Sequence, residues 1–124
     1  MASRSIDDLT PRMREMAVKF LDGCLAAGID VLIYCTYRSP EEQDELHTHG
    51  RTKPGAIVTN ARAGQSKHNS RQAFDCVPLL NGKPQWSDAA TYLKMGAIGE
   101  AAGLTWAGRW NGKLRETAHF QDGK

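Results

Sequence analysis

The stretch that decides the fold of this chain is Ser66-Lys67-His68-Asn69-Ser70-Arg71-Gln72-Ala73-Phe74-Asp75-Cys76-Val77. Its apolar part, residues 73–79, alternates enough to predict a strand. Asp75 lies inside this apolar run, and burying a carboxylate is costly unless it is paired or coordinates a metal. The stretch therefore predicts a core strand that carries one acidic residue, with His68 seven positions before it.

Helices and a further strand are predicted before this segment. Thr10-Pro11 starts a helix with a cap and a proline in the first turn, and Gly28 ends it. Residues 31–37 are β-branched and aromatic, which predicts a buried strand. Residues 39–42 form a capping box for a helix that runs to about His49. Residues 51–67 are polar and aperiodic, which predicts a long loop of functional importance.

The second half of the chain adds a hairpin, a third helix and two short strands. These are a return strand at 83–86 after an Asn81-Gly82 turn, a helix from Ser87 or Asp88 to Ala102, and strands at 104–106 and 118–120. The predicted fold class is α+β, with helices packed on a small, mostly antiparallel sheet. The length of 124 residues suits one domain, expected to span 1–124.

Composition excludes several classes of protein. The net charge of +2 is too small to indicate a nucleic-acid-binding protein, which usually carries a concentrated basic face. No signal segment and no apolar run long enough to cross a bilayer is visible, so stable membrane association is not expected. The three cysteines match no metal or redox spacing, and Cys35 and Cys76 are predicted to be small core residues.

A second polar segment, Glu116-Thr117-Ala118-His119-Phe120-Gln121, follows near the end of the chain. Two imidazoles and one carboxylate make a three-ligand set for a catalytic zinc, which leaves one coordination position for water. The remaining carboxylate would then be the base that acts on this water. From the residues alone, two alternatives stay open: the histidines are hydrogen-bonded parts of the structure, and Glu116 is solvated or paired with Arg115.

Several motifs, in the same order, resemble those of the LAS-type zinc peptidases, the D-alanyl-D-alanine carboxypeptidase and dipeptidase family. The segment from Ser66 to Asp75 is similar to the family signature S-x-H-x-x-G-x-A-x-D, and Glu116-x-x-His119 is similar to its second signature. Tyr37-Arg38-Ser39 with Gln43 resembles the Y-R-[ST]-x-x-x-Q segment. The stretches Trp106-Ala107-Gly108-Arg109-Trp110 and His119-Phe120-Gln121 resemble those of the phage endolysin branch.

The resemblance implies a role for each matching residue and a hedgehog or D-Ala-D-Ala peptidase-like fold. One zinc per chain would be held by His68, Asp75 and His119, and Glu116 would be the general base. Arg38 would bind a substrate carboxylate or stabilise the oxyanion, because its planar fork of donors suits either job. The remaining implied contacts to substrate are Gln43, Ser66 and Trp110. The sequence allows Trp110, like Trp106, to be either the wall of a substrate groove or a core residue.

The function that the resemblance implies is hydrolysis of a peptide bond in the peptidoglycan stem peptide. The expected bond is L-alanyl-D-glutamate, and the expected role is that of a monomeric phage endolysin without a cell-wall-binding domain. Such a protein would be made in the host cytoplasm and act in the periplasm or cell wall after the membrane is permeabilised. The alternatives are a D-Ala-D-Ala carboxypeptidase or dipeptidase and a non-catalytic, zinc-containing wall-binding module.

This sequence departs from the family pattern at two positions. Arg71 occupies the place of the glycine in the first signature, so it is expected either to alter the loop or to meet the substrate. Glu116 stands where the phage branch commonly has aspartate, which lengthens the side chain by about one C–C bond. Neither departure removes an expected metal ligand.

Overall fold

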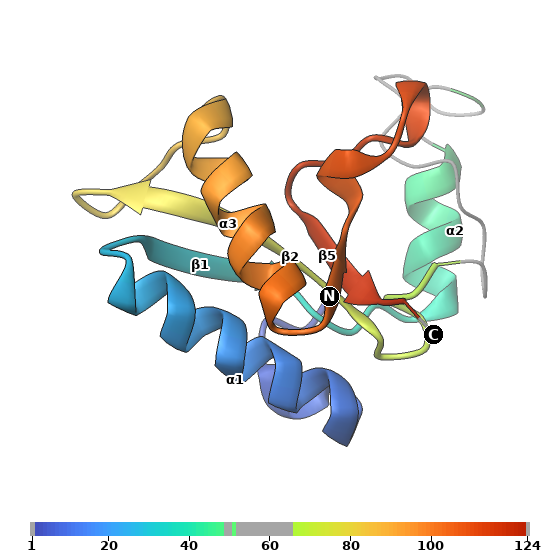
Figure 1. Cartoon of the computed structure of the whole chain (residues 1–124). Coiled ribbons are helices and arrows are strands. Elements are labelled where there is room, and N and C mark those ends of the chain that lie inside the picture. Colours follow the sequence, from blue (N-terminus) through green and yellow to red (C-terminus); the bar gives the residue numbers. More distant parts are fainter. Residues whose placement is uncertain (1, 49–50, 52–65, 124) are drawn as a thin grey trace.

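The structure, a computed structural model, describes residues 2–48, 51 and 66–123. Figure 1 shows helices α1 and α3 side by side, with α2 standing apart from them. The elements are η1 (Ile6–Asp8), α1 (Pro11–Ala26), β1 (Asp30–Cys35), α2 (Pro40–Thr48), β2 (Ala73–Leu80), β3 (Lys83–Pro84), α3 (Ala89–Ala101), β4 (Leu104–Trp106), η2 (Ala107–Arg109), η3 (Gly112–Leu114) and β5 (His119–Asp122).

The sheet runs in the order β1-β2-β5-β4, and β3 pairs with β2. Every strand pairing is antiparallel. Helices α1 and α3 contact each other and the sheet strands, which buries the core between the helical layer and the sheet (Figure 1). The predicted α+β class, with helices on a small antiparallel sheet, is confirmed. None of the helices in the described part of the chain has the length and apolar character that crossing a bilayer requires.

The centre of the core is aromatic. Phe20 of α1 lies 4.8 Å from Phe120 of β5 and 5.4 Å from Phe74 of β2, measured between ring centroids. Trp106 is also buried, and a Cβ placed on Gly96 would meet its ring at 2.2 Å. The absence of a side chain at Gly96 therefore lets α3 lie directly against Trp106, which anchors β4 to the helical layer.

The predicted helix boundaries agree with the structure to within a few residues. Thr10 caps α1 by accepting a hydrogen bond from the backbone N–H of Met13. Asp88, rather than Ser87, caps α3 by accepting one from the backbone N–H of Thr91. Gly28 has φ +74°, a left-handed conformation that a glycine adopts without strain after a helix. The expected helix end at His49 and most of the 51–67 loop lie outside the described residues.

Two strands are shorter than predicted. Strand β1 ends at Cys35 because Thr36 turns to the N-terminal segment, where its N–H donates to the carbonyl of Ser3 at 2.7 Å. Strand β3 covers Lys83–Pro84 only. Proline has no N–H to continue the ladder, so it is found at strand edges and ends.

The backbone of Arg71 adopts a left-handed conformation, with φ 64°, which glycine adopts more easily than arginine. Its guanidinium lies 4.0 Å from the centroid of the Tyr37 ring, and Nη1 donates to the carbonyl of Asp8 at 3.0 Å. The Arg71 carbonyl accepts a hydrogen bond from the N–H of Thr10. The side chain therefore fastens the turn before β2 to the N-terminal segment, and these contacts offset the strain of a left-handed arginine.

We predict that Arg71→Ala destabilises the fold by about 1–2 kcal/mol, because it loses the contacts and keeps the strained φ. Arg71→Gly loses the same contacts but relieves the strain, so it should be about 1 kcal/mol more stable than Arg71→Ala. Urea unfolding of the two variants measures the difference. An alanine variant as stable as the glycine variant would contradict this account of Arg71.

Candidate active site

The polar residues of the site form a row across three neighbouring strands. Asp75 of β2 is paired with Cys35 of β1 on one side and with His119 of β5 on the other. Directly paired residues of antiparallel strands project from the same face of the sheet. The register therefore brings together side chains that lie about 40 residues apart in the sequence, with the Asp75 carboxylate in the middle.

His68 enters this row from the turn that precedes β2. The Ser66 hydroxyl caps the turn by accepting a hydrogen bond from the N–H of His68 at 3.1 Å. Nδ1 of His68 lies 2.9 Å from the backbone carbonyl of Thr36, which makes Nδ1 the protonated nitrogen. Nε2 is thereby directed at Asp75, with 3.2 Å between Nε2 and Oδ1. Ser66 thus serves the turn that holds a predicted ligand.

The ring of His119 is held in the same way by a neighbour on its own strand. Its Nε2 lies 2.8 Å from Oε1 of Gln121, two residues further along β5 and therefore on the same face. Nδ1 lies 3.0 Å from Oδ1 of Asp75. A carbonyl oxygen accepts, so Gln121 fixes Nε2 as the donor and leaves Nδ1 as the nitrogen toward the site.

The site is an electrostatically coupled cluster. Burial would raise the pKa of Asp75, but His68 and His119 hold it well below its usual range. Burial would lower the pKa of His68, yet the negative charge of the neighbouring Asp75 carboxylate raises it to about 10. In the metal-free protein the Asp75 carboxylate is therefore ionised at neutral pH. Both ring nitrogens of His68 carry a proton, so its imidazole is positively charged.

The residues present fit a zinc ion. Nε2 of His68 is buried and makes no hydrogen bond to the described part of the chain, which is rare for a buried polar atom. Two imidazole nitrogens within 3.2 Å of one carboxylate oxygen offer the donors that zinc prefers. Among the described residues, the group whose ligand atoms all lie within 4.8 Å of one another is Cys35, His68 and Asp75.

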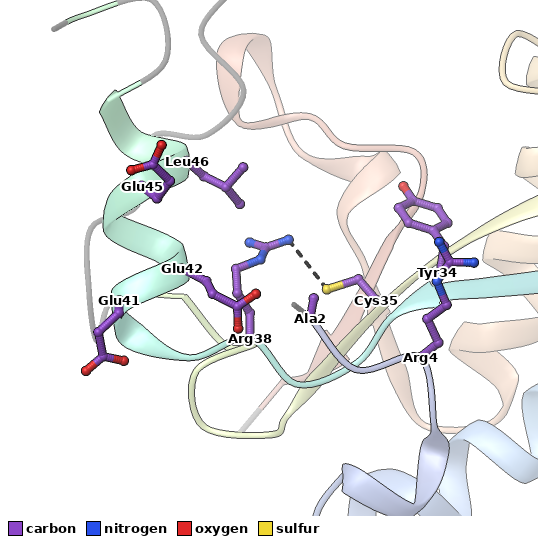
Figure 2. Close-up of a pocket in the computed structure, with 9 residues that line it drawn as sticks. All are labelled: Ala2, Arg4, Tyr34, Cys35, Arg38, Glu41, Glu42, Glu45 and Leu46. Carbon is purple, nitrogen blue, oxygen red and sulfur yellow. Dashed lines mark hydrogen bonds between the residues drawn. The ribbon is translucent and has the colours of Figure 1, made fainter. Parts of the chain in front are cut away.

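Arg38 borders this cluster and is held by Gln43 of α2. Nη1 of Arg38 donates to Oε1 of Gln43 at 2.8 Å, and Gln43 is fully buried. Nη2 lies 3.9 Å from Oδ2 of Asp75 and 3.5 Å from Sγ of Cys35, as Figure 2 shows for the sulfur. The burial places Gln43 behind Arg38, as a residue that orients the guanidinium, rather than on an exposed helix face.

The structure also places the remaining predicted site residues. Oε2 of Glu116 lies 3.8 Å from Nδ1 of His119, and the Glu116 side chain is 52% exposed. The Trp110 ring lies 5.9 Å from the His119 ring and so borders the site. Trp106, in contrast, is a core residue, whose Nε1 donates to the carbonyl of Thr117. Glu116 thus faces solvent beside a predicted ligand, where a water molecule has access.

Three contributors to the site were missed by the sequence analysis. Cys35 is buried, as predicted, but its thiol lies in the metal-capable group instead of serving only the core. Thr36 supplies the carbonyl for His68, and Gln121 holds His119. The H-F-Q stretch contained a signal for Gln121, because residues two apart on a strand share a face. No local pattern could reveal Cys35, since its role depends on the register between β1 and β2.

A partly buried aspartate between two oriented histidines, with a solvent-facing glutamate beside them, offers the donor types that a hydrolytic zinc site uses. A family model described as D-alanyl-D-alanine carboxypeptidase, in the M15 peptidases, matches residues 59–122. The peptidoglycan L-alanyl-D-glutamate endopeptidase CwlK of Bacillus subtilis is 33% identical over 92% of this chain and 73% of its own length. The chain therefore belongs to the M15 peptidase family, whose members are zinc-dependent peptidases.

Solved structures share the fold. The L-Ala D-Glu endopeptidase ChiX of Serratia marcescens has a TM-score of 0.73 at 20% identity, with 98% of this chain and 87% of that chain covered. The D,D-pentapeptidase VanY with Zn(II) has a TM-score of 0.69 at 16% identity, covering 92% of this chain and 72% of that chain. The expected peptidase-like fold is thus confirmed.

We predict that metal binding releases a proton and strengthens with rising pH. His68 has a pKa of about 10 without metal, so its proton must leave before Nε2 can bind an ion. Affinity should rise up to about tenfold per pH unit between pH 6 and 8 and level off only near the pKa. Calorimetry in buffers of different ionisation enthalpy measures the released protons. An affinity that is independent of pH would contradict the raised pKa.

Proposed function

We propose that this chain hydrolyses the L-alanyl-D-glutamate bond of the peptidoglycan stem peptide, with one zinc per chain held by His68, Asp75 and His119. The observation that carries the proposal is the Asp75 carboxylate, with oriented imidazole nitrogens at 3.2 and 3.0 Å and the Glu116 carboxylate next to one of them. The choice of bond is supported by CwlK and ChiX, both of them L-Ala-D-Glu endopeptidases.

The residues divide the chemistry between them. Zinc, when bound, polarises the scissile carbonyl and makes a water molecule more acidic. Glu116, half exposed beside His119, accepts the proton of the attacking water and delivers it to the leaving amine. Thr36 and Gln121 keep the two imidazoles in the tautomers that turn Nε2 of His68 and Nδ1 of His119 toward Asp75.

Arg38 supplies a permanent positive charge beside the proposed metal ligands. Its guanidinium is fixed by the buried Gln43 and lies within 3.9 Å of Asp75, so it does not have to be ordered when substrate arrives. In this position it stabilises the negative charge that develops on the carbonyl oxygen, or it binds a carboxylate of the stem peptide such as that of D-glutamate. Trp110, next to His119, forms a wall for the substrate.

The biological role that we propose is that of a phage endolysin, which reaches the cell wall of its host after the membrane is permeabilised. The support is the order of the motifs, above all the segment 106–110 and the H-F-Q stretch, which resemble the endolysin branch. The mild positive charge of +2 is compatible with weak attraction to an anionic wall polymer.

We predict that the zinc-loaded protein clears a suspension of outer-membrane-permeabilised Gram-negative cells. Mass spectrometry of the digested muropeptides should find a freed L-alanine carboxyl end and a new amino end on D-glutamate. Loss of a terminal D-alanine instead would favour the carboxypeptidase alternative. Cleavage of isolated muropeptides without clearing of cells would count against the lytic role but not against the peptidase.

We predict that Glu116→Gln lowers turnover about 10²–10⁴-fold while zinc content is unchanged, because the amide cannot accept the proton. Glu100→Gln is the matched control: this exposed glutamate pairs with Arg109 outside the site, and its loss should leave turnover unchanged. Turnover is followed on muropeptides, and zinc by elemental analysis. A Glu116→Gln variant that is as fast as the parent would refute the assigned base and favour a different proton acceptor.

A further inference from the structure

Trp86 is a large aromatic residue that serves neither the core nor the chemistry described above. It follows β3, its side chain is 55% exposed, and it packs edge to face against Tyr34 of β1, with 5.2 Å between the ring centroids. The second ring restricts the orientation of the indole, so little freedom is lost when a ligand binds to it. The pair is therefore a rigid, partly exposed aromatic surface.

Tyr34 connects this surface to the proposed active site. The pairing of β1 with β2 shifts between Ile33 and Cys35, so Tyr34 is the extra residue of a β-bulge opposite Asp75. Tyr34 also lines a pocket of about 650 Å³ together with Cys35 and Arg38 (Figure 2). Burial and the negative charge of Asp75 both raise the pKa of Tyr34, which keeps its hydroxyl neutral. The aromatic surface thus continues directly from the pocket that Arg38 borders.

The register places Trp86 beyond the reacting centre, along β2. The N–H of Gln85 donates to the carbonyl of Pro78, which lies three residues after Asp75. At about 3.3 Å per residue, Trp86 is displaced by roughly 10 Å from the proposed metal ligand. Figure 1 shows the β2–β3 end of the sheet far from α2, so the site lies between that helix and the hairpin.

The substrate of the proposed reaction continues past the scissile bond as a sugar. In peptidoglycan, the L-alanine is joined through a lactyl group to the amino sugar N-acetylmuramic acid. The alanine and the lactyl group each span about one extended residue, so the sugar ring begins about 7 Å from the scissile carbonyl. That ring then covers the distance at which Trp86 lies. Sugars bind aromatic rings through their C–H faces, because the contact removes apolar surface from water.

We propose that Trp86, held by Tyr34, is the platform for the sugar ring that carries the stem peptide. The charges support this direction. Arg38, Glu41 and Glu45 line the α2 side of the pocket, which suits the charged residues after L-alanine, whereas the aromatic end suits a sugar. The inference rests on the proposed function, because it names the group on the amino side of the same bond.

A comparison of two substrates tests the proposal on the zinc-loaded protein. One is the disaccharide tripeptide L-Ala-D-Glu-diaminopimelate with its N-acetylglucosaminyl-N-acetylmuramic acid, and the other is the same tripeptide without sugar. The parent should show a KM about 3–10-fold lower with the sugar, at similar kcat. Trp86→Ala should lose this difference and leave the KM of the bare tripeptide unchanged, whereas Trp86→Phe should keep part of it. Leu93→Ala is the matched control, because Leu93 of α3 is similarly exposed at 53%.

Equal KM values for the two substrates in the parent would overturn the platform and leave the peptidase intact. Binding of the free disaccharide gives a readout without activity. It should shift the indole N–H signal that Trp86→Phe removes from the NMR spectrum, and an unshifted signal would overturn the proposal. A signal that follows protein concentration instead would assign Trp86 to a contact between two copies and also overturn it. A shift caused by the disaccharide, without cleavage of either substrate, would support the sugar site and refute the proposed function.

Discussion

The carboxylate of Asp75 is the constraint on which the site depends. A charged group in a central strand costs several kcal/mol unless partners compensate for it. Here the partners are His68, His119 and Arg38, each within 3.9 Å of a carboxylate oxygen. Because β2 is paired on both sides by β1 and β5, the backbone that carries this carboxylate is held in place. The surrounding residues are therefore arranged around Asp75, in a way that suits a bound cation.

Local features of the sequence predicted the helices and most strands, because caps, glycines and apolar spacing act over a few residues. Thr10, Asp88 and Gly28 are examples in which a residue's own chemistry sets an element boundary. The proposed ligands depended on more than local chemistry: the residues alone left structural histidines open, and the resemblance of the ordered motifs to the peptidase family implied the ligand set. Cys35 could not be predicted, since it becomes a site residue only through the register between strands about 40 residues apart. Nothing in the residues adjoining Cys35 distinguishes it from Cys76, which is a core residue.

The two tryptophans of the 106–110 segment show a similar limit. The sequence allowed each to be a core residue or a groove wall. The structure separates them, because Gly96 and Gly108 leave room for the Trp106 ring, whereas the Trp110 ring lies beside His119. The difference depends on two glycines that contact the Trp106 ring: Gly96 in helix α3, and Gly108 two residues further along the chain. Gln43 is a further case: α2 is mostly polar, so its sequence did not indicate that this glutamine is fully buried.

The N-terminal residues are connected to the proposed metal site through Thr36. The N–H and hydroxyl of Thr36 donate to the carbonyls of Ser3 and Ser5, and the carbonyl of Thr36 holds Nδ1 of His68. A segment of this kind is ordinarily treated as dispensable in expression work. In this protein, a truncation that removes residues 3–5 would take away the contacts that hold Thr36, and with them the orientation of the His68 imidazole. Affinity handles intended to leave the site intact should therefore not replace residues 3–5.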